Sequence, residues 1–94
     1  MSHGFHAERH ALHGITVVLD TTAGETFLGR FDSEDERGVH LLDVARHDPA
    51  GGTSRDEFIG RSARYGIRVE RKHVVLPKTS VSRVVPLGEL TAGS

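Results

Sequence analysis

The sequence contains no cysteine and no tryptophan, and its aromatic residues are limited to four phenylalanines and one tyrosine. Without cysteine the chain forms neither disulfides nor thiolate zinc sites, a composition compatible with a reducing compartment. The sequence also lacks an apolar run near the roughly 20 residues that span a bilayer. Its N-terminus has no apolar signal-peptide core. We therefore expect a cytoplasmic protein without a membrane partner.

An excess of either charge is also missing. Twelve lysines and arginines face thirteen aspartates and glutamates, so the formal net charge is −1. Such a chain has no global attraction for nucleic acid, and any phosphate binding must come from a local group of basic residues. The apolar fraction of 36% suits a modest core, and we expect residues 1–94 to form a single domain.

Three strand patterns follow one another between Gly14 and Leu42. Apolar residues recur with a period of two in residues 15–20 and 25–32, and residues 39–44 form a third strand pattern with apolar residues on both faces. This period is typical of a strand that is half buried in a sheet. Gly29 lies between two phenylalanines on one face of the second segment, where glycine usually marks a sharp bend. We therefore expect an antiparallel meander that is strongly bent.

The second half of the chain is predicted to contain a helix and two further strands. Pro49 and two glycines end the third strand, and Ser54 with Glu57 matches a capping box at a helix start. Pro77 ends the fourth strand because proline has no N–H to donate. The expected elements are a loop at 45–53, a helix at 55–64, strands at 67–76 and 81–87, and a frayed tail at 89–94.

Five short, bent strands indicate a mostly β fold, a small antiparallel barrel of the SH3-like or OB type. The side chains in the apolar phase of each strand should form its core. These residues are Val17, Leu19, Phe27, Phe31, Leu41, Val69, Val75 and Val84.

The first 13 residues have few helix breakers and predict a short N-terminal helix laid on the barrel. At 100° per residue, four histidines fall within an arc of about 80° on this helix; they are His3, His6, His10 and His13. Imidazoles at this spacing can bind zinc or nickel. Structural metal sites usually draw ligands from more than one element, so an exposed polar face is the stronger interpretation. We expect no cofactor.

Two segments resemble the motifs of the Sm and LSm family, and within it the bacterial Hfq-type RNA chaperones. The first runs from Gly14 to Leu42 and has glycines at 14, 24 and 29, with one extra residue near Gly38. The second, from Lys78 to Pro86, is similar to the Hfq-type pattern of lysine, histidine, small residue, isoleucine, serine, any residue, valine, valine and proline.

The resemblance implies a homo-oligomeric ring in which strand four of one subunit pairs with strand five of the next. Cyclic pairing is physically reasonable because it covers the open edges of a small sheet. The segment 47–66 would then be an insertion in the connection between strands three and four. That connection varies most within the family.

The resemblance also places a nucleic-acid site at Asp35 of the first motif and at Lys78 and Thr79 of the second. In Hfq-type proteins a Gln-Phe pair stacks uracil, and a Lys-His pair contacts base and phosphate. Here residues 36–38, Glu-Arg-Gly, replace the first pair, and Thr79 replaces the histidine. Four acidic residues also crowd this turn, Asp32, Glu34, Asp35 and Glu36. We therefore expect the uracil site to be lost.

A second basic surface is predicted on the insertion. Residues 55–72 carry six basic and three acidic residues, with Arg61, Arg64 and Arg68 at helical spacing. A solvated helix face would explain the same pattern. We expect a ring-forming Sm-like protein that binds RNA or other single-stranded nucleic acid through a non-standard surface. The alternative is an oligomeric scaffold or protein-interaction module that keeps the ring. No catalytic motif indicates an enzyme.

Overall fold

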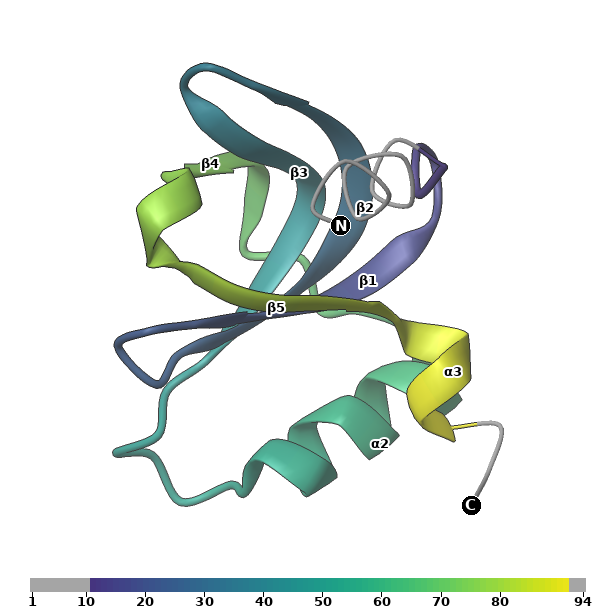
Figure 1. The fold of residues 1–94 in the computed structure, drawn as a ribbon. Helices are drawn as coiled ribbons and strands as arrows, with labels where there is room; N and C mark the ends of the chain where they lie inside the picture. Colours follow the sequence, from purple (N-terminus) through teal and green to yellow (C-terminus); the bar gives the residue numbers. More distant parts are fainter. Residues whose placement is uncertain (1–10, 92–94) are drawn as a thin grey trace.

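The computed structural model of the protein describes residues 11–91, which Figure 1 traces through one strongly bent sheet. The elements are β1 (Thr16–Thr21), β2 (Thr26–Asp35), β3 (Gly38–His47), α2 (Arg55–Tyr65), β4 (Arg71–Leu76), the 3-10 turn η1 (Lys78–Ser80), β5 (Val81–Pro86) and α3 (Leu87–Thr91). The strands are antiparallel and lie in the order β4-β3-β2-β1-β5. Strands β4 and β5 are therefore the two edges of the sheet.

The five predicted strands are confirmed, although several of their ends differ from the prediction. Strand β2 continues to Asp35, and its polar end pairs with β3, as in the pair of Glu34 and Val39. Strand β3 likewise continues to His47, through residues that the sequence assigned to a loop. Polar residues extend the hairpin because backbone hydrogen bonds can form without burial of the side chains.

A β-bulge bends β3. Leu42 pairs with Arg30 and Ala45 pairs with Leu28, so β3 has one residue more than β2 between these pairs. Within this bulge Asp43 adopts a positive φ of 53°. An extra residue in one strand of an antiparallel pair kinks that strand and increases its twist.

The residue opposite the bulge is Gly29, where the sequence predicted a bend. A Cβ at Gly29 would lie 3.0 Å from both the carbonyl oxygen of Leu42 and a methyl carbon of Val44, so a side chain would have to displace β3. The bulge also changes which residues face inward. Val39, Leu41 and Val44 all belong to one buried cluster. Without the bulge, strict alternation along β3 would place Val44 on the face opposite to Leu41.

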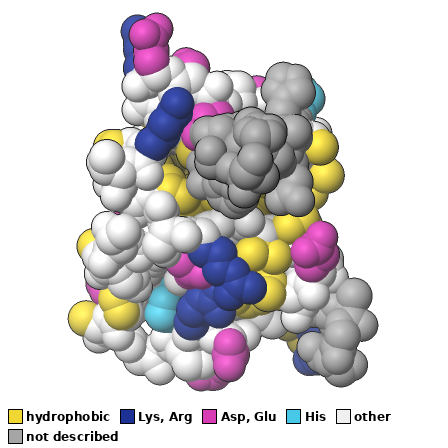
Figure 2. All heavy atoms as spheres, in the orientation of Figure 1, with side chains coloured by type: hydrophobic (Ala, Val, Ile, Leu, Met, Phe, Trp, Pro, Cys, Tyr) yellow, Lys and Arg dark blue, Asp and Glu magenta, His cyan; other side chains and the backbone are white. Residues whose placement is uncertain are grey.

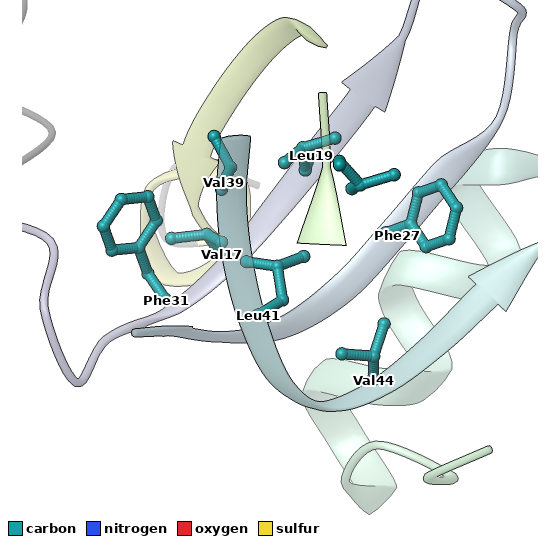
Figure 3. Close-up of a cluster of buried hydrophobic side chains, with 8 residues drawn as sticks. Val17, Leu19, Phe27, Phe31, Val39, Leu41 and Val44 are labelled. Carbon is teal, nitrogen blue, oxygen red and sulfur yellow. The ribbon is translucent and has the colours of Figure 1, made fainter. Parts of the chain in front are cut away.

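Two apolar clusters lie on opposite faces of the sheet. The larger one, drawn in Figure 3, contains Val17, Leu19, Phe27, Phe31, Val39, Leu41, Val44 and Leu76. The smaller one contains Val18, Leu28 and Ile59, with Phe58, Ile67, Leu87 and Leu90 packed against it. Helices α2 and α3 therefore cover the second face of the sheet (Figure 1).

The core prediction is confirmed for five buried residues, Val17, Leu19, Phe27, Phe31 and Leu41. Val84 is partly buried and packs against the larger cluster. The prediction is wrong for Val69 and Val75, which are 49% and 37% exposed.

The error on β4 has a simple cause. Val74 and Leu76 pack on the core, so the inward phase is the opposite of the one assigned from sequence. A slip of one residue exchanges the two faces of a strand. Strand β4 also begins at Arg71, and residues 66–70 form an irregular connection that includes the exposed Val69.

The capping box correctly predicts α2. The Ser54 hydroxyl accepts a hydrogen bond from the Glu57 N–H at 3.1 Å, and the Glu57 carboxylate accepts one from the Ser54 N–H at 3.3 Å. The helix ends one residue later than predicted, at Tyr65. Gly66 follows it with φ of 91°, a conformation that glycine adopts without a Cβ penalty.

The two ends of the chain differ from their predictions in different ways. The helix predicted at 1–13 falls mainly outside the described residues, and residues 11–14 form turns. The tail predicted at 89–94 is wrong for its first part, because α3 extends to Thr91 and packs Leu87 and Leu90 on the smaller cluster. Among residues 11–91, no helix is long and apolar enough to cross a membrane.

Candidate nucleic-acid interfaces

The six predicted binding residues divide between two surfaces. The first, which we call the hairpin end, comprises the β2–β3 turn, the η1 link and the side chains of Asp35, His40, His73, Lys78 and Thr79. The second, which we call the helix pocket, lies between β3, α2 and residues 66–70, and it includes Arg61 and Arg68. Arg64 lies on α2 beside this pocket. In Figure 1 the β2–β3 turn and α2 lie at opposite ends of the molecule.

Close backbone packing joins the two segments of the hairpin end. Gly38 has φ of 136°, and a Cβ on it would overlap the Leu76 carbonyl oxygen and lie 3.0 Å from the Pro77 Cα. Lys78 follows Pro77 directly, and Thr79 is exposed beside it in η1. The structure therefore brings Lys78 next to the turn that begins after Asp35.

The Asp35 carboxylate is part of a hydrogen-bonded network. Its oxygen Oδ1 lies 2.9 Å from His40 Nε2 and accepts a hydrogen bond from the Arg37 N–H at 2.9 Å. His40 Nδ1 lies 2.9 Å from His73 Nε2, and the two rings stack with centroids 5.1 Å apart. Since a carboxylate only accepts, neutral His40 is assigned a hydrogen on Nε2 and accepts through Nδ1 from His73. The hydrogen bond from His40 lowers the pKa of Asp35.

The hairpin end combines bonded acidic and histidine side chains with an exposed lysine. Figure 2 shows acidic and basic side chains beside each other at the tip of the β2–β3 hairpin. Asp35 and His40 are already bonded to each other. Lys78 is exposed and forms no ion pair with any residue in the described range.

The helix pocket has a volume of about 400 Å³, within the range of small-ligand sites. Local contacts hold its loop side in place. His47 is 8% exposed, its Nε2 donates to the Thr53 carbonyl, and its ring centroid lies 5.4 Å from that of Phe58. The Asp48 carboxylate accepts a hydrogen bond from the Ala50 N–H at 2.9 Å. These contacts fix the β3–α2 loop against the helix.

An ion pair fixes the start of α2 on β1. Arg55 donates from Nε and Nη2 to the two oxygens of Asp20 at 3.0 and 2.8 Å, and the Thr26 hydroxyl donates to the same carboxylate at 2.7 Å. Burial raises the pKa of Asp20, but the hydrogen bonds from Arg55 and Thr26 and the charge of Arg55 outweigh it, so the pKa is lowered. The hydrogen bond to Asp20 raises the pKa of Arg55. Helix α2 is thus held in one position.

The charged side chains at the helix pocket differ in their partners. Arg46 binds Glu25 at 2.6 Å, and this hydrogen bond raises the pKa of Arg46. Arg61 and Arg68 are exposed and form no hydrogen bond or ion pair with the part of the chain that the structure describes. They are the uncommitted positive charges of the pocket.

Tyr65 is a residue that the sequence analysis missed. Its side chain is 78% exposed, it lines the pocket, and the Arg64 guanidinium lies 5.9 Å from its ring centroid. A signal was available, because Tyr65 follows Arg61 by four residues and therefore shares its helix face.

The predicted histidine metal site stays a prediction, because most of its residues lie outside the described chain. His3, His6 and His10 lie outside the described residues, and His13 is exposed and donates from Nδ1 to the Asp32 carbonyl. Within residues 11–91, no group of three or more histidine, aspartate or glutamate side chains could hold a metal ion.

No family model and no curated protein matches the sequence. Solved structures match in fold. The SmAP1 heptamer of P. aerophilum is 16% identical with a TM-score of 0.60, over 86% of this chain and 89% of that one. An Sm-like archaeal protein from Pyrobaculum aerophilum is 16% identical with a TM-score of 0.56, over 85% of this chain and 48% of that one. The chain therefore has a fold similar to that of Sm-like proteins.

Proposed function

We propose that the chain is a subunit of an Sm-like homo-oligomeric ring that binds single-stranded RNA, as a binding protein and not an enzyme. The main support for the ring is that the sheet has two open edges. Strands β4 and β5 each pair with one neighbour, so each leaves an unpaired edge within the described chain. Unpaired edges invite pairing with another chain. The SmAP1 heptamer, whose fold is similar, supports cyclic assembly.

The second half of β4 is the better part of this edge. Residues 71–73 are two cations and a histidine, all exposed, whereas residues 74–76 are apolar. Pairing residues 74–76 with β5 of the next subunit would continue the sheet across the interface and bury Val75. On this proposal, the exposure of Val75 in the single chain is the mark of the interface.

The RNA part of the proposal is supported by the helix pocket. Its free cations, Arg61 and Arg68, line the same pocket as the exposed ring of Tyr65. Phosphates bind such cations and bases stack on aromatic faces. The ring would repeat this surface once per subunit, and repetition raises avidity without new contacts. In this proposal the connection that carries α2 is an insertion in a cytoplasmic protein of Hfq-like ancestry.

Light scattering on the unmodified chain tests the ring. We expect a mass several times that of one chain, and we expect Val75→Lys to reduce it to a single chain because a charge would be buried at the interface. Ile15→Lys is the matched control, since Ile15 is 41% exposed and precedes β1, which is not an edge strand. A parent chain that scatters as a monomer would refute the ring.

Fluorescence anisotropy with labelled U-rich and A-rich oligonucleotides tests RNA binding. We expect binding that weakens steeply with salt and shows little base preference, because stacking on Tyr65 accepts any base. A flat titration at low salt would remove RNA from the proposal.

A scaffold that assembles proteins is the second candidate function. It is favoured by the acidic turn, where Asp32, Glu34, Asp35 and Glu36 oppose a phosphate ligand. This alternative expects the same ring in light scattering and no oligonucleotide binding near physiological salt.

A further inference from the structure

The helix pocket has the size and the fixed walls of a small-molecule site. Its volume of about 400 Å³ is enough for one nucleotide, and small-ligand pockets begin at roughly 300 Å³. The contact of His47 with Thr53 and Phe58 holds one wall, and the pair of Arg55 with Asp20 holds the helix. A pocket with such walls exists before the ligand arrives, so binding spends little free energy on ordering the protein.

Both acidic and basic side chains line this pocket. Asp48 and Glu70 line it, and after the larger effect of Glu25 both carboxylates help to raise the pKa of Arg46. The negative side chains therefore lie near Arg46. Arg61 and Arg68 have no acidic partner among residues 11–91 and remain available to an anion.

Tyr65 supplies a flat apolar surface at the same pocket. An aromatic ring that is 78% exposed leaves most of its surface in water, and a stacked base would cover it. The guanidinium of Arg64, 5.9 Å from the ring centroid, is close enough for a cation–π contact that restrains the ring. Two unpaired cations and an exposed aromatic ring thus line one open pocket.

We propose that the helix pocket binds one nucleotide, with its base stacked on Tyr65 and its phosphate held by Arg61 and Arg68. This inference deepens the proposed function, because a bound RNA would supply the nucleotide. The shared chemistry of base and phosphate would equally fit a free mononucleotide, and the experiment below includes both sources.

The chain carries its own reporter for this site. Tyr65 is its one tyrosine and tryptophan is absent, so intrinsic fluorescence excited in the tyrosine band comes from the proposed stacking residue alone. We would titrate the full chain with uridine 5′-monophosphate and adenosine 5′-monophosphate, and correct for absorbance with free N-acetyltyrosinamide. We expect saturable quenching by both nucleotides, weaker quenching by the nucleosides, and none by inorganic phosphate.

Substitutions test whether the two arginines hold the phosphate. Arg61→Ala with Arg68→Ala should weaken nucleotide binding by about tenfold or more, because two charge-assisted contacts are lost. Arg37→Ala, at the exposed β2–β3 turn, is the matched control and should leave the titration unchanged. An absence of saturable quenching, or quenching that the double variant does not weaken, would overturn the proposal.

Anisotropy with oligonucleotides separates this proposal from RNA binding itself. Tyr65→Leu should weaken binding at least several-fold and Tyr65→Phe should retain it, since phenylalanine keeps a stacking face. Equal binding by the parent and Tyr65→Leu would refute the pocket and leave the RNA function standing. Quenching by mononucleotides without oligonucleotide binding would support the pocket for free nucleotides and refute the RNA function.

Discussion

The hairpin end and the helix pocket contain similar kinds of charged side chain in different states. At the hairpin end Asp35 is bonded to His40, and His40 lies within hydrogen-bond distance of His73, so the polar groups are turned toward one another. At the helix pocket Arg61 and Arg68 are left without partners in the described chain. A count of charges does not distinguish the two surfaces. Lys78 at the hairpin end is likewise without an ion pair in the described chain, so the surfaces differ in Asp35 and His40, which are bonded to each other.

The two surfaces also rest on different cores. The hairpin end is supported by the larger cluster. Phe31 and Leu41 belong to this cluster and pair with each other across β2 and β3. The helix pocket is supported by the smaller cluster, which contains Ile59 of α2 and against which Phe58 of α2 packs. Changes to one cluster should therefore affect the two surfaces unequally.

The largest effect should come from Phe31→Ala. Phe31 is 2% exposed, and its truncation leaves a cavity that should lower the free energy of unfolding by about 3–5 kcal/mol. Phe58→Ala, at a half-buried position beside the pocket, should lower it by about 1–2 kcal/mol. Urea unfolding measures both. A midpoint for Phe31→Ala equal to that of the parent would contradict the assignment of the larger cluster.

The next effect concerns the salt dependence of RNA binding. Replacing Arg61, Arg64 and Arg68 together with alanine should lower the slope of log affinity against log salt by about 3 per subunit engaged. Lys78→Ala, at the hairpin end, should lower it by about 1 at most. A larger loss with Lys78→Ala than with the triple variant would make the hairpin end the principal RNA surface.

A smaller effect should follow from Asp20→Asn, which removes the charge that Arg55 binds. We expect a loss of about 1 kcal/mol at neutral pH, because the pair is partly exposed and screened. The folded-state pKa of Asp20 is below its usual value of 3.8, so its stabilisation is present above that value and is lost as the pH falls through the folded pKa.

Urea unfolding at about pH 7 and about pH 3 checks this dependence. The difference between the parent and Asp20→Asn should shrink in acid. Glu36→Gln, at the exposed turn, is the control and should show no such difference at either pH. A gap that stays constant with pH would show that the Asp20 charge does not stabilise the fold.

The smallest effect should be at Asp35 itself. His40→Leu removes the hydrogen bond that lowers the pKa of Asp35, so this pKa should rise toward its usual value of 3.8. Carboxyl NMR chemical shifts followed against pH measure the change. RNA affinity should remain as in the parent, because the hairpin end is not the proposed binding surface. An unchanged Asp35 pKa would mean that His40 does not control it.

The sequence predicts those elements that local pattern decides. The alternation around Val17 and Phe27 identifies β1 and β2, and the serine and glutamate of the capping box identify the start of α2. Each of these signals comes from residues close together in the chain. Gly29 also indicates the bend correctly, since the close approach of β3 leaves no room for a side chain.

Features that depend on distant residues could not be predicted in this way. The inward phase of β4 is set by which of Val74 and Val75 faces the core, and both are equally apolar. Asp20 and Arg55 are 35 residues apart, so their pairing follows from the fold and not from local pattern. The sequence also does not show that the side chains of Arg61 and Arg68 lack hydrogen-bond and ion-pair partners in the described chain. The six predicted binding residues therefore stay a prediction, and the structure shows only that they lie on two separate surfaces.

The contact of Gly38 with Leu76 and Pro77 has a mechanical consequence. With no room for even one carbon atom between them, the hairpin turn and the end of β4 cannot slide past each other. We therefore expect hydrogen exchange to show the turn and the end of β4 opening together, because the opening of one would break its contact with the other. Position 38 therefore admits no side chain without loosening the strand edge.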